Sequence, residues 1–190
     1  KNSRKHVDGT SVLLKAFGAK LVLTPASKGM GGAIAKAEEI TATQNGFLFQ
    51  QFNDPDNPKT HRETTGPEIW EQTQGKITHL VACSGTGGTI SGTAKYLKEQ
   101  NPNIKIWGID TYGSIFKKLK ETGTIDKNEI YPYVTEGIGE DFLPENVNID
   151  IIEDFEKVTD KDGAIMTARI VREEGIWVGN SSGAALQGLI

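Results

Sequence analysis

A cluster of glycines and threonines at 84–89, with the sequence SGTGGT, is the part of the chain best suited to do chemistry. It lies between an apolar, β-branched run over 77–83 and a run with helical spacing that begins at Ile90. Backbone N–H groups in the first turn of a helix lack partners within the helix and point towards an anion. Glycine lets a ligand approach the backbone, and the Thr86 and Thr89 hydroxyls add donors. The segment therefore predicts a site for a phosphate monoester that needs neither a base nor a metal.

Two nucleotide-binding patterns fail at this loop. The GxGxxG pattern, started at Gly85, requires glycine at position 90, where the chain has Ile90, and GxxxxGK fails at the same position. NAD and ATP are therefore disfavoured as ligands. A tight strand-to-helix turn without a ligand is the alternative, and the density of glycine and threonine favours the binding site over it.

Composition limits the other classes of function. The net charge is −4, with Lys and Arg scattered, so no nucleic acid or anionic membrane partner is expected. No apolar run approaches the roughly 18 to 20 residues of a membrane span, so no membrane segment is expected. The single cysteine, Cys83, excludes an internal disulfide and suggests the cytoplasm; we assign it no role. The histidines His6, His61 and His79 have no zinc-ligand spacing, so no metal site is expected.

The elements that must position the loop follow from the apolar periodicity. It predicts helices over 11–17, 30–43 and 65–73 and from 90, 159 and 180, and strands over 19–24, 77–83, 104–110, 149–152 and 176–178. Residues 53–65 are expected to form a long connection, and Thr65 to Glu68 a capping box. Strand, helix and strand in this length form a βαβ unit. The fold class predicted is α/β, a parallel sheet with helices on both faces.

Helix caps and faces are also expected from the residue types. Thr159 and Asp162 are expected to cap the helix from 159, which Gly175 ends and whose buried face would hold Ala164, Ala168 and Val171.

Four segments together make the sequence similar to a known family. They are NPKTHRETTGPEIWEQT at 57–73, GTGGT at 85–89, EGIGEDFLP at 136–144 and GNSSGAA at 179–185. The chain resembles the cysteine synthase and cystathionine β-synthase family, which are pyridoxal 5'-phosphate (PLP) dependent enzymes of fold type II. The resemblance runs from about residue 11 to the end. It implies an incomplete fold, in which 1–46 is the end of a small N-terminal domain and 47–190 most of a large PLP-binding domain.

The resemblance implies roles for particular residues. Gly85, Thr86, Gly87, Gly88 and Thr89 would hold the PLP phosphate, Ser181 would meet the pyridine nitrogen, Gln51 would bind the substrate carboxylate, and Gly137, with Gly139, would belong to a loop that closes over the substrate. Alternatives stay open for three of these. Ser181 could be a helix N-cap, Gln51 an ordinary loop amide, and Gly137 part of a turn.

The resemblance also implies that the lysine forming the Schiff base with PLP lies upstream of this chain, so no catalytic residue is assigned. Lys28 aligns with an ordinary position of the family. The parent protein is expected to be a homodimer that performs β-replacement on serine or O-acetylserine with a thiol or sulfide. Gly113-Ser114-Ile115 and the EGIGEDF segment are closer to cystathionine β-synthase, with cysteine synthase as the alternative. A catalytically silent PLP-binding or regulatory module, and a nucleotide-type phosphate-ester domain, are the alternatives of other classes.

Overall fold

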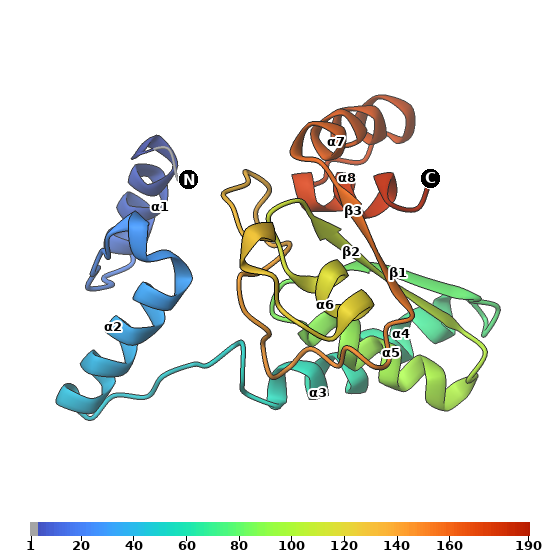
Figure 1. The fold of residues 1–190 in the computed structure, drawn as a ribbon, viewed down its shortest axis with the longest axis horizontal. Helices are drawn as coiled ribbons and strands as arrows, with labels where there is room; N and C mark the ends of the chain where they lie inside the picture. The colour runs from blue at the N-terminus through green and yellow to red at the C-terminus, as the bar shows by residue number, and fades with distance from the viewer. Residues whose placement is uncertain (1–3) are drawn as a thin grey trace. The chain divides into compact units, whose positions relative to one another are not determined.

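The computed structural model describes residues 4–190, which divide into two compact units (Figure 1). The first unit ends at Phe49 and the second is Gln50–Ile190. The first contains helix α1 (Arg4–Ala16), the short 3-10 helix η1 (Ala26–Lys28) and helix α2 (Gly29–Gln44). The helices predicted over 11–17 and 30–43 are confirmed, and α1 begins earlier than its apolar spacing indicated.

The strand predicted over 19–24 is wrong. The structure assigns no strand there, and Leu23 is 66% exposed. A strand is stable only where a neighbouring strand satisfies its backbone N–H and C=O groups. No segment of residues 4–190 pairs with this one in the structure.

The second unit contains seven further helices, counting one 3-10 helix, and a sheet. In chain order they are α3 (Asp56–Glu63), α4 (Thr65–Gln72), β1 (His79–Cys83), α5 (Gly88–Gln100), β2 (Lys105–Thr111), α6 (Phe116–Thr122), η2 (Lys127–Glu129), β3 (Asp154–Val158), α7 (Asp160–Glu174) and α8 (Asn180–Gln187). The strands lie in the order β1-β2-β3 and both pairs are parallel. The α/β class and the βαβ unit are therefore confirmed.

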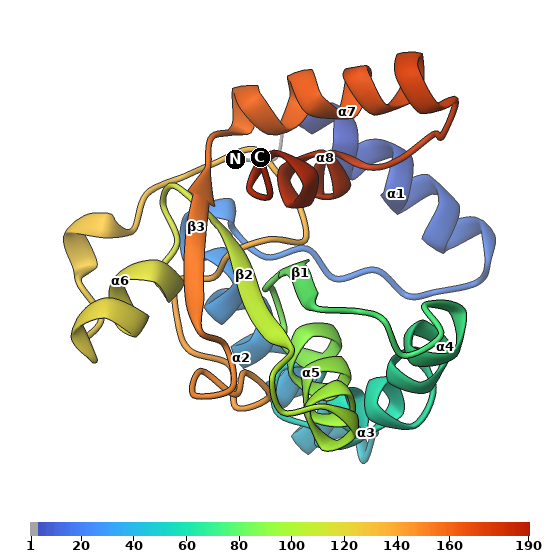
Figure 2. The same ribbon diagram turned by 90° about the vertical axis from the view of Figure 1, so that its right-hand side faces the viewer.

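Helices cover both faces of this sheet, as predicted (Figure 2). Alternation along the strands sends Ile106 and Phe155 to one face, where they pack with Phe116 of α6 and with α5. The other face carries Ile109, which packs with α8 through Ala184. The predicted face of α5, with Ile90, Ala94 and Leu97, is fully buried. Each such aliphatic or aromatic side chain contributes roughly 1.5 to 3 kcal/mol on burial, which fixes α5 against the sheet.

The long connection predicted over 53–65 is wrong, since most of that segment forms helix α3 (Asp56–Glu63). Its start is set by Asp54, whose carboxylate accepts the N–H of Asp56 at 2.9 Å. Pro55 and Pro58 lie at the start of the helix, where a missing N–H removes no intrahelical bond. The prolines therefore mark a helix start and not a loop.

The capping box predicted at Thr65 is also wrong. Thr64 occupies the N-cap of α4, and no side chain caps that helix. The Thr65 hydroxyl lies 2.9 Å from Nδ1 of His61 instead, so α3 takes the group that was expected to cap α4.

Two further predicted strands are not formed. At 149–152 the side-chain oxygen Oδ1 of Asn148 accepts the N–H groups of Asp150 and Ile151, which makes a turn, and β3 begins only at Asp154. Residues 176–178 have no strand partner within the described chain, and Trp177 is 88% exposed. Apolar β-branched runs predicted strands here, but pairing decides whether a strand exists.

The caps of α7 are as predicted, but its buried face is not. The Thr159 hydroxyl accepts the N–H of Asp162 at 3.1 Å, and Gly175 ends the helix at φ +68°. The buried residues are Gly163, Met166 and Ile170, whereas the predicted residues Ala164 and Ala168 are exposed and Val171 is half-buried. The helix packs against α8 through Gly163, so the absence of a side chain, which hydropathy does not register, sets the face.

Candidate functional site

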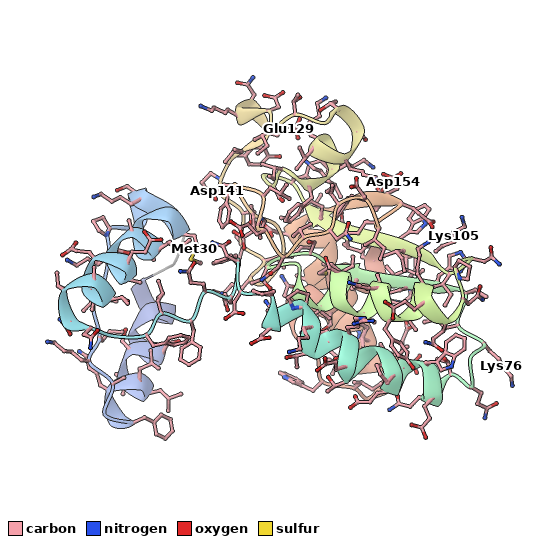
Figure 3. All side chains as sticks on the ribbon, turned by 90° about the horizontal axis from the view of Figure 1, so that it is seen from below. Met30, Lys76, Lys105, Glu129, Asp141 and Asp154 are labelled. Carbon is pink, nitrogen blue, oxygen red and sulfur yellow. The ribbon has the colours of Figure 1, made fainter. Side chains whose placement is uncertain are left out.

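The glycine loop lies at the edge of the sheet where the parallel strands end. Figure 3 separates the two edges, with Lys76, Lys105 and Asp154 near the strand starts and Asp141 towards the strand ends. Ser84 follows β1 directly, and four residues later the chain enters α5. Ligands of open α/β sheets bind at the carboxyl ends of the strands. The predicted phosphate loop is therefore at the edge where a ligand site is expected.

The N-terminus of α5 is not capped by the protein. Its N-cap, Gly87, has φ +86°, no side chain caps the helix, and the first turn contains no acidic residue. In the described part of the chain, no N–H from Gly85 to Thr89 donates to another backbone group. These donors and the positive end of the helix dipole remain available to an anion.

Packing behind the loop accounts for two of its glycines. A Cβ at Gly87 would lie 2.3 Å from the Val147 side chain, and one at Gly88 would lie 1.8 Å from Oδ1 of Asn57. Both positions therefore exclude a side chain before any ligand is considered. Val147 and Asn57 pack directly against the loop backbone, and this packing holds the N–H groups of the loop in place.

Gln51 lies close to the loop through its backbone. Its carbonyl accepts Nδ2 of Asn57 at 2.7 Å and Nδ2 of Asn146 at 2.9 Å, and the same Asn57 nitrogen lies 3.2 Å from Oγ1 of Thr86. The Gln51 side chain is exposed. Asn57 thus links the backbone of Gln51 to the loop, and the Gln51 side chain is exposed next to this link.

Gly137 lies beside the first residue of the loop. A Cβ built on Gly85 would be 3.1 Å from the Gly137 carbonyl, and the N–H of Gly139 donates to the Ser84 carbonyl at 2.8 Å. Gly137 and Gly139 have φ of +77° and +75°, a backbone conformation that glycine adopts without strain. The EGIGEDF segment therefore runs along the start of the glycine loop.

Ser181 lies in the first turn of α8, which meets the end of β1. The Cys83 thiol donates to the Ser181 carbonyl at 3.2 Å. The N-cap of α8 is Gly179, and no side chain caps it, so the N-cap reading of Ser181 is wrong. Burial, and next the charge of Asp110, raise the pKa of Cys83 to about 11. A thiol with that pKa is a poor nucleophile.

A polar network that the sequence did not reveal holds the start of α8. Nδ2 of Asn180 donates to the Thr135 hydroxyl at 3.0 Å, and that hydroxyl donates to Asp160 at 2.6 Å. Asp160 also accepts the N–H groups of Val134 and Thr135. Burial would raise the pKa of Asp160, but the hydrogen bonds from Thr135 and Val134 outweigh it and hold the pKa below its ordinary value. An ionised Asp160 thus ties the residue before Ser181 to the start of α7.

Two carboxyl groups near the strand ends have raised pKa values. Asp110 is fully buried, its Oδ1 has no partner among the described residues, and burial raises its pKa. Glu140 follows Gly139, and burial, then the charge of neighbouring Asp141, raise its pKa to about 7. A glutamate that titrates near neutrality places less negative charge beside the loop than an ordinary one.

Two features absent from the described residues bear on other classes of protein. Within 4–190 no group of three or more His, Cys, Asp and Glu side chains could hold a metal ion. In the same range no helix has the length and apolar character needed to cross a membrane.

Comparison with known sequences gives consistent matches. Residues 4–190 match the family described as "Pyridoxal-phosphate dependent enzyme". The chain is 43% identical over 179 residues to the cysteine synthase of Staphylococcus aureus strain N315, a match covering 94% of this chain and 55% of that protein. It is 39% identical over 176 residues to cysteine synthase A of Escherichia coli K12, covering 92% and 54%. The chain therefore spans about half the length of the curated relatives it matches.

Solved structures give the same picture for the fold. The O-acetylserine dependent cystathionine β-synthase of Helicobacter pylori superposes with a TM-score of 0.84 at 36% identity, covering 96% of this chain and 57% of that one. The cysteine synthase of Entamoeba histolytica superposes with a TM-score of 0.80 at 33% identity, covering 94% and 51%.

Proposed function

The chain belongs to the pyridoxal-phosphate dependent enzyme family, as its four motifs predicted, and from this premise we propose that its parent protein catalyses β-replacement on serine or O-acetylserine. The incoming nucleophile is a thiol or sulfide, and the product is a sulfur-containing amino acid. The observation that carries the proposal is the uncapped N-terminus of α5, with its free N–H groups and two threonine hydroxyls.

The residues at this loop fit the phosphate group of PLP. A phosphate dianion needs several short donors and no nearby carboxylate, and the first turn of α5 contains no acidic residue. Ser84 is fully buried at the base of the loop, and its hydroxyl has no partner among the described residues, so a further donor remains there. We assign the phosphate to Gly85, Thr86, Gly87, Gly88 and Thr89, and the pyridine nitrogen to Ser181.

Each group of the chain then has a stated task. Bound PLP supplies an electron sink for the α-carbon of the amino-acid substrate. The start of α5 neutralises the phosphate and fixes the orientation of the ring. A neutral hydroxyl at Ser181 does not favour a protonated ring, which moderates the sink and suits loss and replacement of a β-substituent.

The substrate side of the site is assigned to two segments. The exposed Gln51 amide binds the substrate carboxylate, and the segment at Gly137 closes over the substrate and excludes water. We assign neither the covalent bond to PLP nor removal of the α-proton to any lysine of this chain. The lysine that forms the Schiff base with PLP stays a prediction.

The choice of nucleophile separates the two candidate activities. The segments that favour cystathionine β-synthase contact each other, since the Ser114 hydroxyl accepts the N–H of Glu140 at 3.1 Å. The H. pylori structure is that of an O-acetylserine dependent cystathionine β-synthase, which is consistent with a thiol nucleophile. The matches to proteins named cysteine synthase favour sulfide and make that activity the second candidate.

Product analysis of the full-length parent protein tests the proposal. Serine or O-acetylserine with homocysteine should give cystathionine, whereas O-acetylserine with sulfide giving cysteine at a higher kcat/KM would make the protein a cysteine synthase. Reduction with borohydride and peptide mapping would identify the lysine that binds PLP. Cofactor absorbance without turnover of either pair would contradict the proposal and leave a silent PLP-binding module.

Two further expectations go with the proposal. We expect the parent protein to be a homodimer located in the cytoplasm. Light scattering of the full-length protein measures the first and cell fractionation the second.

A further inference from the structure

We propose that helix α3 positions the phosphate-binding hydroxyls of the loop, with Asn57 directing Thr86 and His61 directing Thr89. The inference rests on the proposed function, because it takes a phosphate as the ligand of the loop. It makes His61, for which no role is predicted from the sequence, a positioning residue that acts through Thr89.

The two side chains lie one helical turn apart on the same face of α3. That face is pressed against α5. A Cβ built on Gly92 would lie 2.0 Å from the Pro58 carbonyl and 2.9 Å from Cβ of His61. Because Gly92 has no side chain, α3 approaches closely enough for both of its polar side chains to reach the loop.

Asn57 leaves the Thr86 hydroxyl only one direction in which to donate. Nδ2 of Asn57 contacts the Gln51 carbonyl and Oγ1 of Thr86. A backbone carbonyl only accepts, so the nitrogen of the amide must face it, and the same nitrogen donates to Thr86. Oγ1 of Thr86 is therefore an acceptor towards the protein, and its hydrogen is free for a ligand.

His61 can set the Thr89 hydroxyl in the same way. Its Nε2 lies 3.2 Å from Oγ1 of Thr89, and its Nδ1 lies 2.9 Å from Oγ1 of Thr65. A neutral imidazole has one donor and one acceptor nitrogen. With the proton on Nδ1, the ring accepts from Thr89 and turns that hydroxyl away from the ligand. With the proton on Nε2, the ring donates to Thr89, and Thr65 donates to Nδ1.

A phosphate in the loop selects the second arrangement. Phosphate oxygens accept hydrogen bonds, so Thr89 must donate outwards and take its inward hydrogen bond from His61. Occupancy of the loop is thereby coupled to the position of one proton on His61 and to the orientation of Thr65 at the start of α4.

Binding measurements on the full-length protein test the positioning role. His61→Ala should weaken PLP binding about tenfold, a change of about 1.4 kcal/mol. His61→Gln, whose amide nitrogen can donate at the place of Nε2, should recover most of that loss. The control is His79→Ala, because Nδ1 of His79 also contacts a threonine hydroxyl, that of Thr78, but at the opposite end of β1. That variant should bind PLP as the wild type does, and equal affinity in folded His61→Ala would overturn the inference.

A spectroscopic readout does not depend on activity or on a variant. The ring ¹⁵N shifts of His61, recorded in alkaline buffer so that the neutral ring is observed, should show the Nε2–H form when inorganic phosphate is added. A ring that keeps its proton on Nδ1 with phosphate bound would overturn the inference and leave the proposed function intact. A wild-type protein that binds neither phosphate nor PLP would overturn both.

Discussion

The starts of α5 and α7 differ although both helices follow parallel strands of one sheet. α7 begins one residue after β3, and its N-cap Thr159 accepts the N–H of Asp162 while its hydroxyl donates to the Asp162 carboxylate. Its first turn also contains Asp160. α5 begins after a four-residue connection and has no side-chain cap and no acidic residue in its first turn.

The difference shows where the protein leaves its helix dipoles unsatisfied. α7 fills its N-terminus with its own oxygens, so its first N–H groups contribute to stability and not to binding. α5 forgoes that stabilisation of about 0.5 to 2 kcal/mol, and its N-terminus stays open to an external anion. Two helices at the same sheet edge are therefore divided between stability and binding.

The largest effect is expected when α5 is given an acidic residue in its first turn, as α7 has. Thr89 is exposed in the first turn, so Thr89→Asp fits without a steric cost. A carboxylate within about 4 to 5 Å of a phosphate should weaken PLP binding about 100-fold or more. Helix stability should hold or rise slightly, by about 0.3 to 1 kcal/mol. Equilibrium dialysis with PLP measures the affinity, and thermal unfolding measures the stability.

The matched control is Thr89→Asn, which has the same shape without the charge. Its PLP affinity should fall about tenfold, because it lacks only the threonine hydroxyl and adds no charge. If the two variants bind PLP equally, charge at the start of α5 does not govern binding. The absence of acidic residues there would then not explain why α5, and not α7, binds an anion.

The second test concerns the helix that packs behind each N-terminus. Gly92→Ala places a Cβ 2.0 Å from the backbone carbonyl of Pro58, which cannot rotate away, whereas Gly163→Ala places one 3.4 Å from Cβ of Ala184. The first change should lower the free energy of unfolding by about 1 to 3 kcal/mol. The second should be neutral or raise it by up to about 1 kcal/mol, since alanine favours a helix over glycine.

Urea unfolding of the full-length protein without PLP measures both changes. Equal stabilities of the two variants would show that α3 is not pressed against α5 as tightly as the geometry requires.

The sequence predicted much of this site because its signals are local. The glycine loop, the helix after it and the Thr159 cap each depend on residue types within a few positions of one another. The resemblance added Ser181, Gln51 and Gly137, which the structure brings to the same sheet edge.

What the sequence did not predict depends on contacts between distant segments. His61 and Asn57 reach the loop only because α3 packs on Gly92. The two prolines in this segment led to the prediction of a connection in place of the helix. The link from Asn180 through Thr135 to Asp160 spans segments far apart in the chain. The proline signal was available, since proline is tolerated in a first helical turn. No local pattern indicates the other contacts.

The cap of α7 should matter for stability alone. Thr159→Ala removes the hydroxyl that accepts from Asp162 and should lower the free energy of unfolding by about 1 kcal/mol. Its effect on PLP affinity should stay within about twofold, because the start of α7 is not a binding site in this division. Denaturant unfolding and PLP titration of the same preparation provide both numbers. A tenfold loss of PLP affinity would show that the two helix starts are coupled.

The same division extends to two carboxylates, Asp160 and Glu140. Hydrogen bonds hold the pKa of Asp160 below its ordinary value of 3.8, whereas burial raises the pKa of Glu140 from 4.5 to about 7. For Asp160 the stabilising form is the charged one, present above pH 3.8 and lost as the pH falls through its folded pKa. For Glu140 it is the neutral one, fully favoured below pH 4.5 and lost as the pH rises to about 7.

Glu140→Gln should therefore stabilise the protein by an amount that depends on pH. Above pH 7 the variant should be more stable than the wild type by on the order of 1 kcal/mol, after discounting for the screening of a partly exposed group. The advantage should shrink below pH 7 and vanish below pH 4.5, where the wild-type carboxyl is neutral in both the folded and unfolded chain. Asp160→Asn should show the opposite sign, with a loss of stability at neutral pH that fades in acid. Unfolding curves of Glu140→Gln between about pH 4 and 8, and of Asp160→Asn from about pH 7 to below pH 3.8, decide this. A pH-independent difference for Glu140→Gln would mean that the carboxyl is not held in its neutral form beside the loop.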